Sequence, residues 1–328
     1  MSSSPLLSIR LFVYNGEAFI RDALDSLLSQ TFRDFELIIS DNASTDSTGE
    51  ICESYAACNS RIRYHRNEKN MGAGWNIRSV FSLATGKYFK WAACDDICAP
   101  EFLERCINAL ERDPSIVLAH SRTRVIDEHG HFLENYNWPM QTDSSAAVTR
   151  FREMLLNDHM CYQIFGVIRR DALLRLPPQG SYVNSDGVLL ARLSFEGRFW
   201  EDPEYLFTSR RHLAQSSKTL PARLKKRRFR LTRRFGTLPC PEWWDPNQTK
   251  TISFPEWRQL KEYFLSTLKA PVGQWERVQS LALLAPWTVK HFRRMMKDLI
   301  IAADQVLYNM QMASLTKRNL QEAEGKSV

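Results

Sequence analysis

The chain has 328 residues, of which 44% are hydrophobic and 25% are charged, a composition that is ordinary for a folded globular protein and argues against a disordered class. Its seven cysteines include no CxxC pair, which favours a reducing compartment over a disulfide framework. The net charge of +7 is unevenly divided, because residues 218–328 hold 21 Lys and Arg against 9 Asp and Glu while residues 1–217 hold 23 against 28, and this predicts two regions with separate roles.

The sequence contains no pattern typical of an export signal or a membrane span. The amino-terminal stretch MSSSPLLSIR has only a short apolar run, which Arg10 interrupts. No later run approaches the ~18 uncharged apolar residues that a spanning helix needs. We therefore expect a cytosolic protein.

Residues 1–217 alternate between strand-like and helical patterns. Strands are expected at 7–14, 35–40, 61–65, 87–93 and 115–121. Helices are expected between them, at 17–30, 47–57, 73–85 and 100–113. This alternation predicts an α/β fold, with an open and mostly parallel sheet that carries helices on both faces.

Polar residues follow three of the expected strands. Tyr14-Asn15 ends the first strand, Asp41-Asn42 follows the second, and Asp95-Asp96 follows the fourth. In open α/β sheets ligands bind beyond the carboxyl ends of the strands, so these residues predict the binding site.

The adjacent acids Asp95 and Asp96 suit two separate tasks. Successive side chains that leave a strand point to opposite sides. One carboxylate can therefore ligate Mg²⁺ or Mn²⁺, which take their other oxygens from substrate phosphates and water, while its neighbour accepts hydrogen bonds from a sugar hydroxyl. The alternative, that the pair caps the helix beginning near Pro100, remains open at this stage.

Several segments in order along the chain resemble the family 2 glycosyltransferases. They are VYN (13–15), DALDSLLSQTFRDFELIISDNASTD (22–46), NMGAGWN (70–76), CDDICAPEFLE (94–104), SDGVLLARLSFEGRF (185–199) and RRHLAQSS (210–217). Agreement of several motifs at the expected spacing is a stronger signal than one acidic pair. The resemblance implies a GT-A fold over residues 1–217 and an inverting enzyme that uses a nucleotide-diphosphate sugar and a divalent metal, Mn²⁺ or Mg²⁺.

The same resemblance implies roles for individual residues. Tyr14 corresponds to the aromatic that packs against the nucleotide base, Asp41 to the carboxylate that accepts the base N–H, and Asp95 to the ribose contact. Asn15 and Asn42 adjoin them and are included in the expected nucleotide site. Two positions correspond to the metal site, Asp96 and His212.

Asp186 corresponds to the catalytic base. A carboxylate near the acceptor hydroxyl takes its proton as the oxygen attacks the anomeric carbon from the face opposite the departing diphosphate. Three alternatives stay open. Asp186 suits a helix-terminal dipole partner, His212 suits a surface histidine, and Cys94, where many members carry Asp or His, suits a catalytically silent nucleotide-sugar-binding module.

Residues 218–328 predict a basic, mainly helical extension. The run PARLKKRRFRLTRR (221–234) holds eight cationic residues and no acid, and it lacks the interleaved aromatics of a nucleic-acid platform, so no nucleic-acid partner is expected. Trp243 and Trp244 suit either aromatic packing or stacking on an acceptor sugar. An amphipathic helix is expected further on, with the apolar stripe Phe292, Met296, Leu299, Ala303, Val306 and Met310.

Two interpretations of this helix are open, packing against the catalytic domain or peripheral contact with the inner face of the membrane. The expected partners are a donor nucleotide sugar, with UDP as first choice and dTDP as second, and a glycan or lipid-linked acceptor. Such partners place the enzyme in cell-surface glycan or polysaccharide biosynthesis.

Overall fold

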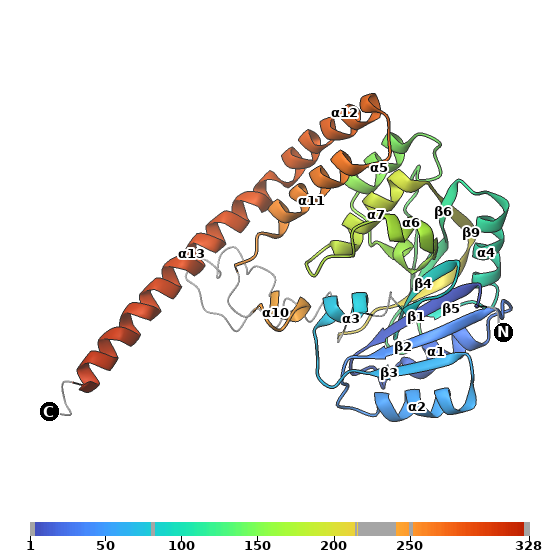
Figure 1. The fold of residues 1–328 in the computed structure, drawn as a ribbon, viewed down its shortest axis with the longest axis horizontal. Helices are drawn as coiled ribbons and strands as arrows, with labels where there is room; N and C mark the ends of the chain where they lie inside the picture. The colour runs from blue at the N-terminus through green and yellow to red at the C-terminus, as the bar shows by residue number, and fades with distance from the viewer. Residues whose placement is uncertain (1–3, 80–82, 214, 216–240, 249–251, 325–328) are drawn as a thin grey trace.

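The computed structural model describes residues 4–79, 83–213, 215, 241–248 and 252–324. It contains one sheet in which the order of strands is β3-β2-β1-β4-β8-β6-β9-β5, with β7 paired to β6. Helices cover both faces of this sheet, and a helical hairpin extends away from it (Figure 1). The basic run at 221–234 and the expected boundary at 217/218 lie outside the described residues.

The first half of the sheet is parallel. Its strands are β3 (Ile62–Arg66), β2 (Phe35–Asp41), β1 (Leu7–Val13) and β4 (Tyr88–Ala93). Helices α1 (Ile20–Leu28), α2 (Thr48–Cys58) and α3 (Ala73–Ser79) connect them in chain order. The predicted alternation of strands and helices is confirmed here, although the helix expected at 73–85 is described only as far as Ser79. Each crossover between these parallel strands is made by a helix.

The second half of the sheet is mixed. Its strands are β5 (Ile97–Cys98), β6 (Ile116–Ile126), β7 (Phe132–Tyr136), β8 (Val167–Arg169) and β9 (Arg198–Arg210). The short β8 runs antiparallel to both β4 and β6, and β9 runs parallel to β6 but antiparallel to β5. The predicted α/β class is confirmed, whereas the mostly parallel pattern holds only for the half that sequence alternation described.

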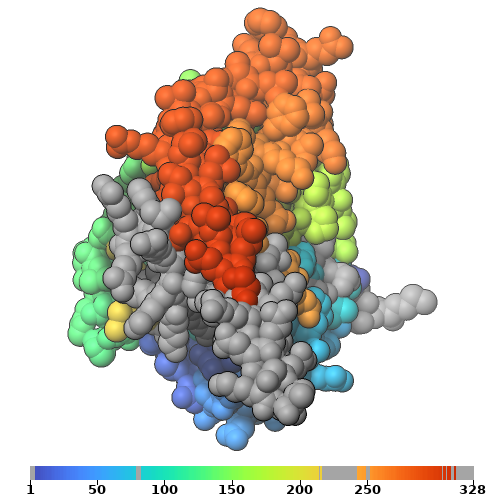
Figure 2. All heavy atoms as spheres, turned by 90° about the vertical axis from the view of Figure 1, so that its left-hand side faces the viewer, coloured from blue at the N-terminus to red at the C-terminus, as the bar shows by residue number. Residues whose placement is uncertain are grey.

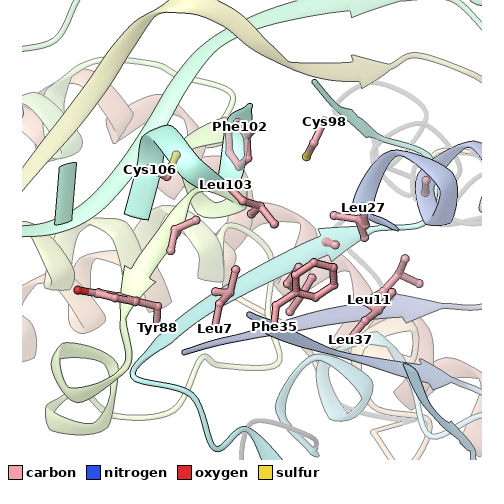
Figure 3. Close-up of a cluster of buried hydrophobic side chains, with 14 of the residues drawn as sticks. Leu7, Leu11, Leu27, Phe35, Leu37, Tyr88, Cys98, Phe102, Leu103 and Cys106 are labelled. Carbon is pink, nitrogen blue, oxygen red and sulfur yellow. The ribbon is translucent and has the colours of Figure 1, made fainter. Parts of the chain in front are cut away.

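A core of aliphatic and aromatic side chains lies between the parallel strands and helices α1 and α4 (Phe102–Arg112). Figure 3 shows Leu7, Leu11 and Leu37 from the strands meeting Leu27 of α1 and Leu103 of α4. Removing this apolar surface from water contributes roughly 25 cal/mol per Å², so the core fixes the strands whose carboxyl ends carry the polar residues.

A second core covers the opposite region of the sheet. Helices α5 (Ala147–Leu156) and α7 (Ser185–Glu196) pack together there, with the rings of Phe151 and Phe195 stacked 4.5 Å apart. The short helix α6 (Arg170–Arg175) and the 3-10 turn η2 (Tyr162–Phe165) complete this layer. This core holds α7, whose first turn contains Asp186.

The extension is helical, as predicted, and it packs onto α7. Its helices are α10 (Pro241–Trp244), α11 (Pro255–Lys269), α12 (Gln274–Ala282) and α13 (Leu284–Glu324). Buried Arg192 of α7 binds Glu262 of α11 at 2.5 Å and donates to Ser266 Oγ at 2.9 Å. Since an unpaired buried charge is costly, this ion pair makes α11 part of the environment of α7.

The predicted apolar stripe of α13 does not face the protein. Trp287, His291 and Met295 pack inward instead, and Trp257 of α11 donates to the Met295 carbonyl at 3.1 Å. Phe292 is 57% exposed, on the outer side of a helix that Figures 1 and 2 show extending along the outside of the molecule. Packing of the helix against the catalytic domain is confirmed, but the contact is made by a neighbouring stripe centred on Trp287 and not by the predicted one.

The adjacent tryptophans lie in α10, which packs against α3. The rings of Trp243 and Trp244 meet edge to face at 4.4 Å, and the Trp244 carbonyl lies where a side chain on Gly72 would need to be. This arrangement favours the packing interpretation of the pair over stacking on a sugar.

Candidate functional site

The carboxyl ends of β2, β1 and β4 meet at one edge of the sheet. Cα partners in the register are Val13 with Asp41, and Phe12 with Ala93. The three polar groups that follow these strands therefore lie side by side, as the sequence predicted.

The loop after β1 is fixed by hydrogen bonds to the loop after β2. Asn15 has a left-handed backbone (φ 52°), its N–H donates to Ser44 Oγ at 2.9 Å, and its side-chain oxygen accepts from the Thr45 N–H at 2.8 Å. A side chain on Gly16 would lie 2.6 Å from Val13, so the close approach requires glycine here. Asn15 thus shapes the loop, and Tyr14 stands exposed beside it.

Asp41 is buried and accepts four hydrogen bonds. One carboxylate oxygen accepts from the N–H and hydroxyl of Ser44 at 2.8 and 2.6 Å, and the other accepts from Tyr64 at 2.8 Å and Arg66 at 2.9 Å. A carboxylate has about four acceptor positions, so all are in use. A nucleotide base can bind Asp41 only by replacing a donor, and Arg66, whose side chain is half exposed, has room to move.

Asn42 makes three side-chain contacts of its own within the protein. Its side-chain oxygen accepts from Asn67 at 3.0 Å and from the Met71 N–H at 2.9 Å, and its amide donates to Asn70 at 2.9 Å. These bonds hold the segment that precedes α3 against the end of β2. Asn42 therefore positions the chain around the strand-end site.

His212 lies against Asp95. The imidazole Nε2 is 2.9 Å from Asp95 Oδ2, and the ring packs 4.7 Å from that of Phe19 at the start of α1. The sequence placed His212 with Asp96 in the metal site and Asp95 at the ribose. The structure brings His212 to Asp95, which makes these two side chains a potential pair of ligands.

Asp96 is turned toward the backbone of β9. Its carboxylate accepts from the Arg210 N–H at 3.1 Å and from the Ser209 hydroxyl. Burial, together with the nearby charge of Asp95, raises the pKa of Asp96 well above its ordinary value. A cation bound nearby would stabilise the ionised form of Asp96. Buried acids that bind metal ions commonly depend on the charge of the ion in this way.

The arginines before His212 are committed to protein partners. Arg210 is buried, donates to Asp22 at 2.8 Å and to the Asp95 carbonyl at 3.3 Å, and lies 4.7 Å above the ring of Phe19. Arg211 pairs with Glu134 of β7 at 2.6 Å and also bonds to Tyr162. Neither is simply solvated, and both fasten the end of β9 around the acidic pair.

The residues present fit a divalent cation that draws most of its ligands from the substrate. No group of three or more His, Cys, Asp and Glu side chains within the described ranges is arranged to hold a metal unaided. The carboxylate of Asp95 and the imidazole of His212 do lie 2.9 Å apart at the strand ends, with Asp96 next in the chain, and Mg²⁺ is commonly held by one or two protein ligands plus substrate phosphates and waters.

Asp186 lies in the first turn of α7. The helix follows Asn184, which has a left-handed backbone (φ 61°), and the Asp186 carboxylate accepts from the Gly187 N–H at 2.9 Å. Burial raises the pKa of Asp186 above its ordinary value, and the nearby His159 opposes this only in part. The backbone N–H groups of Asp186 and Gly187, in the first turn of the helix, lower the pKa, so the geometry fits both a helix-terminal acid and a proton acceptor.

Sequence reasoning missed the residues that surround Asp186. A side chain on Gly187 would lie 3.6 Å from Cys161 Sγ and 3.9 Å from the Tyr263 hydroxyl. Tyr263 is buried and comes from α11, in the extension. Its side chain is far from Asp186 in sequence, and no local pattern predicts such a contact.

The turn η2 joins the two parts of the site. Cys161, just before it, faces Gly187 beside Asp186, and Tyr162 bonds to Arg211 next to His212. At its other end the Phe165 carbonyl accepts from Lys90, in the strand that leads to Asp95 and Asp96. The arrangement can therefore hold a charged leaving group at the strand ends and accept a proton at Asp186.

Comparison with known proteins gives an independent view of the same region. The model of the family described as "Glycosyl transferase family 2" matches residues 8–176, more than half of the chain. Chondroitin synthase of Escherichia coli is 31% identical over 159 residues, which are 48% of this chain and 22% of that protein. The putative glycosyltransferase EpsE of Bacillus subtilis (strain 168) is 34% identical over 131 residues, 40% of this chain and 47% of its own.

These matches span less than half the length of those relatives. Among solved structures, S. aureus TarS 1-349 in complex with UDP-GlcNAc has a TM-score of 0.57 and 16% sequence identity, and the alignment covers 87% of this chain and 72% of TarS 1-349. At that identity the likeness shows a shared fold, and it includes most of the extension as well as the sheet.

Proposed function

Because this chain belongs to glycosyl transferase family 2 and has the GT-A fold, it is a glycosyltransferase, and we propose that it moves a sugar from a nucleotide-diphosphate donor to an acceptor hydroxyl with inversion. One observation carries the proposal. The acidic pair Asp95–Asp96, with His212 against it, lies at the carboxyl ends of the same parallel strands that carry Tyr14 and Asp41.

In this proposal the nucleotide lies across the ends of β1, β2 and β4. Tyr14 packs against the base, Asp41 accepts a base N–H, and Asp95 contacts the ribose. Asp96 and His212 hold a divalent cation, which when bound supplies the positive charge that offsets the charge of the diphosphate. A UDP sugar is the first choice, and the shared fold of TarS, solved with UDP-GlcNAc, supports it.

Asp186 is the base in the transfer step. Its carboxylate takes the proton of the acceptor hydroxyl while that oxygen bonds to the anomeric carbon, and the bond to the diphosphate breaks on the opposite face. The raised pKa of Asp186 brings its affinity for a proton closer to that needed near neutral pH. The acceptor is a glycan or a lipid-linked saccharide of cell-surface or polysaccharide biosynthesis.

The donor assignment predicts stabilisation by a uridine nucleotide together with a divalent cation. UDP with Mn²⁺ is expected to raise the melting temperature more than UDP alone, because a ligand at ~100 times its Kd adds about 2.7 kcal/mol of apparent stability. Thermal unfolding with UDP, dTDP and GDP, each with and without Mn²⁺, measures this. Slow hydrolysis of a UDP sugar by the same preparation tests catalysis, and no shift with any of the three nucleotides contradicts the proposal.

We further propose that the enzyme is cytoplasmic and attaches to the inner face of the membrane through α13. Apolar side chains are exposed at 289, 292, 296, 299, 300, 306, 307 and 310, which share one face of the helix. Arg293 lies at the edge of that face, where it suits anionic headgroups, whereas Lys290 is paired with Asp158 at 3.0 Å. No helix in the described part of the chain combines the length and apolar character needed to cross a bilayer.

This attachment predicts binding to vesicles that contain an anionic phospholipid, and weaker binding to neutral vesicles or in high salt. Replacing Phe292 and Leu299 together with glutamine is expected to lower co-sedimentation roughly tenfold or more, since two apolar side chains no longer enter the interface. Phe132→Gln with Leu133→Gln, a pair exposed on β7, is the matched control.

Equal sedimentation with neutral and anionic vesicles would end the membrane proposal. A dimer that the paired change at Phe292 and Leu299 dissociates would assign this face to a second copy of the chain instead.

A further inference from the structure

Tyr263 is a residue of the extension that reaches the proposed base. Its hydroxyl, on α11, lies 3.9 Å from the point where a side chain on Gly187 would begin. Gly187 follows Asp186 in the first turn of α7. Burial raises the pKa of the Tyr263 hydroxyl, and the nearby charge of Asp186 adds to this effect. The hydroxyl therefore keeps its proton and can donate a hydrogen bond.

The ring of Tyr263 is held in place by contacts that join three helices. Tyr263 is only 5% exposed, and its ring meets that of Trp287 of α13 edge to face, with the ring centroids 5.6 Å apart. The preceding residue, Glu262, binds Arg192 of α7 at 2.5 Å, which fixes α11 against α7. A tyrosine has only two side-chain torsions, so holding its hydroxyl at the start of α7 costs little entropy.

The Tyr263 hydroxyl has no hydrogen-bond partner among the described residues. Buried tyrosine hydroxyls usually find one. The hydroxyls of Tyr64 and Tyr88, for example, donate to Asp41 at 2.8 Å and to Glu111 at 2.9 Å. A buried donor that is left unpaired lowers stability, and an oxygen of a bound ligand would satisfy it.

Glycine at position 187 leaves a small space between Tyr263 and Cys161. A side chain on Gly187 would lie 3.6 Å from Cys161 Sγ and 3.9 Å from the Tyr263 hydroxyl, which are ordinary van der Waals distances. Alanine would therefore fit there, and in a helix alanine is favoured over glycine. By contrast, a side chain on Gly74 would lie 2.7 Å from Ser181 Cβ and would clash. Contacts thus require glycine at 74 but not at 187, and such a departure from the favoured residue is typical of a functional position.

The start of α7 is accessible to a ligand. Asn184, just before the helix, is exposed, and Asp186 is half-buried. Met160, next to Cys161 in the chain, is 53% exposed. A ligand can therefore approach Asp186 from solvent, and the almost fully buried Tyr263 lies deeper in the protein beside the same turn.

From this arrangement we propose that Gly187 and Tyr263 bind the acceptor sugar beside the base. Because Asp186 and Gly187 are adjacent in one turn, two adjacent hydroxyls of a sugar can meet them together. The reacting hydroxyl lies against Asp186, and its neighbour occupies the space at Gly187 and hydrogen-bonds to the Tyr263 hydroxyl. The acceptor is then a sugar with two adjacent free hydroxyls. The proposal rests on the glycosyltransferase function above, whose donor site involves neither Gly187 nor Tyr263.

The test measures acceptor binding directly, without any donor. The probes are p-nitrophenyl glycosides of glucose, galactose, N-acetylglucosamine and N-acetylgalactosamine, titrated by saturation-transfer NMR, each with deoxy analogues that lack one of two adjacent hydroxyls. The wild type is expected to bind at least one glycoside, and to bind one of its deoxy analogues roughly fivefold more weakly. Tyr263→Phe is expected to weaken binding of that glycoside roughly fivefold, and Gly187→Ala roughly tenfold, because the methyl group occupies the space.

A cycle of protein and ligand changes assigns the contact to Tyr263. If the missing hydroxyl of the deoxy analogue is the partner of Tyr263, then Tyr263→Phe should bind that analogue as tightly as the wild type does. Losses of affinity that simply add, for the variant and the analogue, would show that Tyr263 does not contact this hydroxyl.

The melting temperature separates a binding role from a structural one. Tyr263→Phe removes an unpaired hydroxyl and Gly187→Ala removes a helical glycine, so both ligand-free variants should keep or gain melting temperature. Tyr55→Phe, at a hydroxyl on α2 that donates to Asp25 at 2.7 Å, is one matched control. Gly273→Ala, just before α12 where a side chain has room, is the other. Both controls should leave glycoside binding unchanged, and the affinity for UDP with Mn²⁺ should be the same in all of these proteins.

Failure of this proposal can be told apart from failure of the proposed function. If the protein binds UDP but no glycoside, or if both variants bind the glycosides as the wild type does, the acceptor site is wrong and the donor site stands. A loss of affinity that comes with a lowered melting temperature in both variants would assign Gly187 and Tyr263 to the fold. If glycoside binding is weakened in both variants and no nucleotide binds, the acceptor site is supported and the donor site alone is contradicted.

Discussion

Replacing Asp186 with asparagine is expected to lower sugar transfer by roughly 10²- to 10⁴-fold while the affinity for UDP stays near that of the wild type. Asparagine keeps the size of the side chain and can still accept from the Gly187 N–H, but it cannot take the acceptor's proton. Transfer rate and UDP binding measured on one preparation of Asp186→Asn therefore separate chemistry from binding.

The same variant has a distinct stability profile. Burial raises the pKa of Asp186, so between about pH 4 and that raised pKa the folded protein binds more protons than the unfolded chain. Stability contributed by the protonated acid is then present below about pH 4 and lost as pH rises through this window. Asparagine does not titrate, so Asp186→Asn does not lose this stability. The melting temperature of the variant, relative to that of the wild type, should therefore increase as the pH rises from 4 to 7.

Glu196, at the other end of α7, provides the control. It pairs with Arg175 at 2.7 Å, and Glu196→Gln is expected to transfer sugar at close to the normal rate. Near-normal transfer by Asp186→Asn would show that another group is the base. If Asp186→Asn lowers the melting temperature by the same amount at pH 4 and at pH 7, Asp186 serves to stabilise the helix.

Replacing Asp96 with asparagine is expected to remove the part of UDP affinity that depends on Mn²⁺. The amide can still accept from the Arg210 N–H, so β9 should stay in place, but a neutral side chain is a poor ligand for a hard cation. Calorimetric titration with UDP, with and without Mn²⁺, measures the effect. Asp34→Asn, at an exposed acid before β2, should keep the full response to Mn²⁺.

The contact between Asp95 and His212 makes a second variant informative. If Asp95→Asn loses the response to Mn²⁺ and Asp96→Asn keeps it, the roles of the two acids are exchanged, and the cation is held where His212 already lies. Loss of the response in both variants would instead mean that the two carboxylates share the cation.

The sequence predicts the strand ends well because they depend on local pattern. Strand, turn and helix signals between residues 7 and 113 are strong enough to place Tyr14, Asp41 and Asp95 at one edge of the sheet, where the structure has them. The sequence does not predict contacts that depend on the register between neighbouring strands. Arg66 reaches Asp41 because the two are Cα partners across β2 and β3, and no single-sequence signal reports that alignment.

Long-range packing explains the remaining differences. The periodicity of α13 correctly indicates an apolar stripe around Phe292, but the side that packs is the one where Trp287 meets Tyr263 of α11, a contact between distant segments. The mixed half of the sheet was missed because β8 has only three residues and follows an irregular segment. Such short strands carry too little pattern to be recognised.

The ion pair between Arg192 and Glu262 also bears on how the protein is made. Helix α7 leaves the ribosome before α11 is synthesised, and at roughly 5–20 residues per second the interval between them lasts several seconds. Throughout that interval Arg192 lacks its partner, and the side of α7 that Tyr263 later covers has no helix against it. The surroundings of the proposed base are therefore completed late in synthesis, once α11 has emerged, so a nascent chain that stops short of α11 should carry an unfinished site.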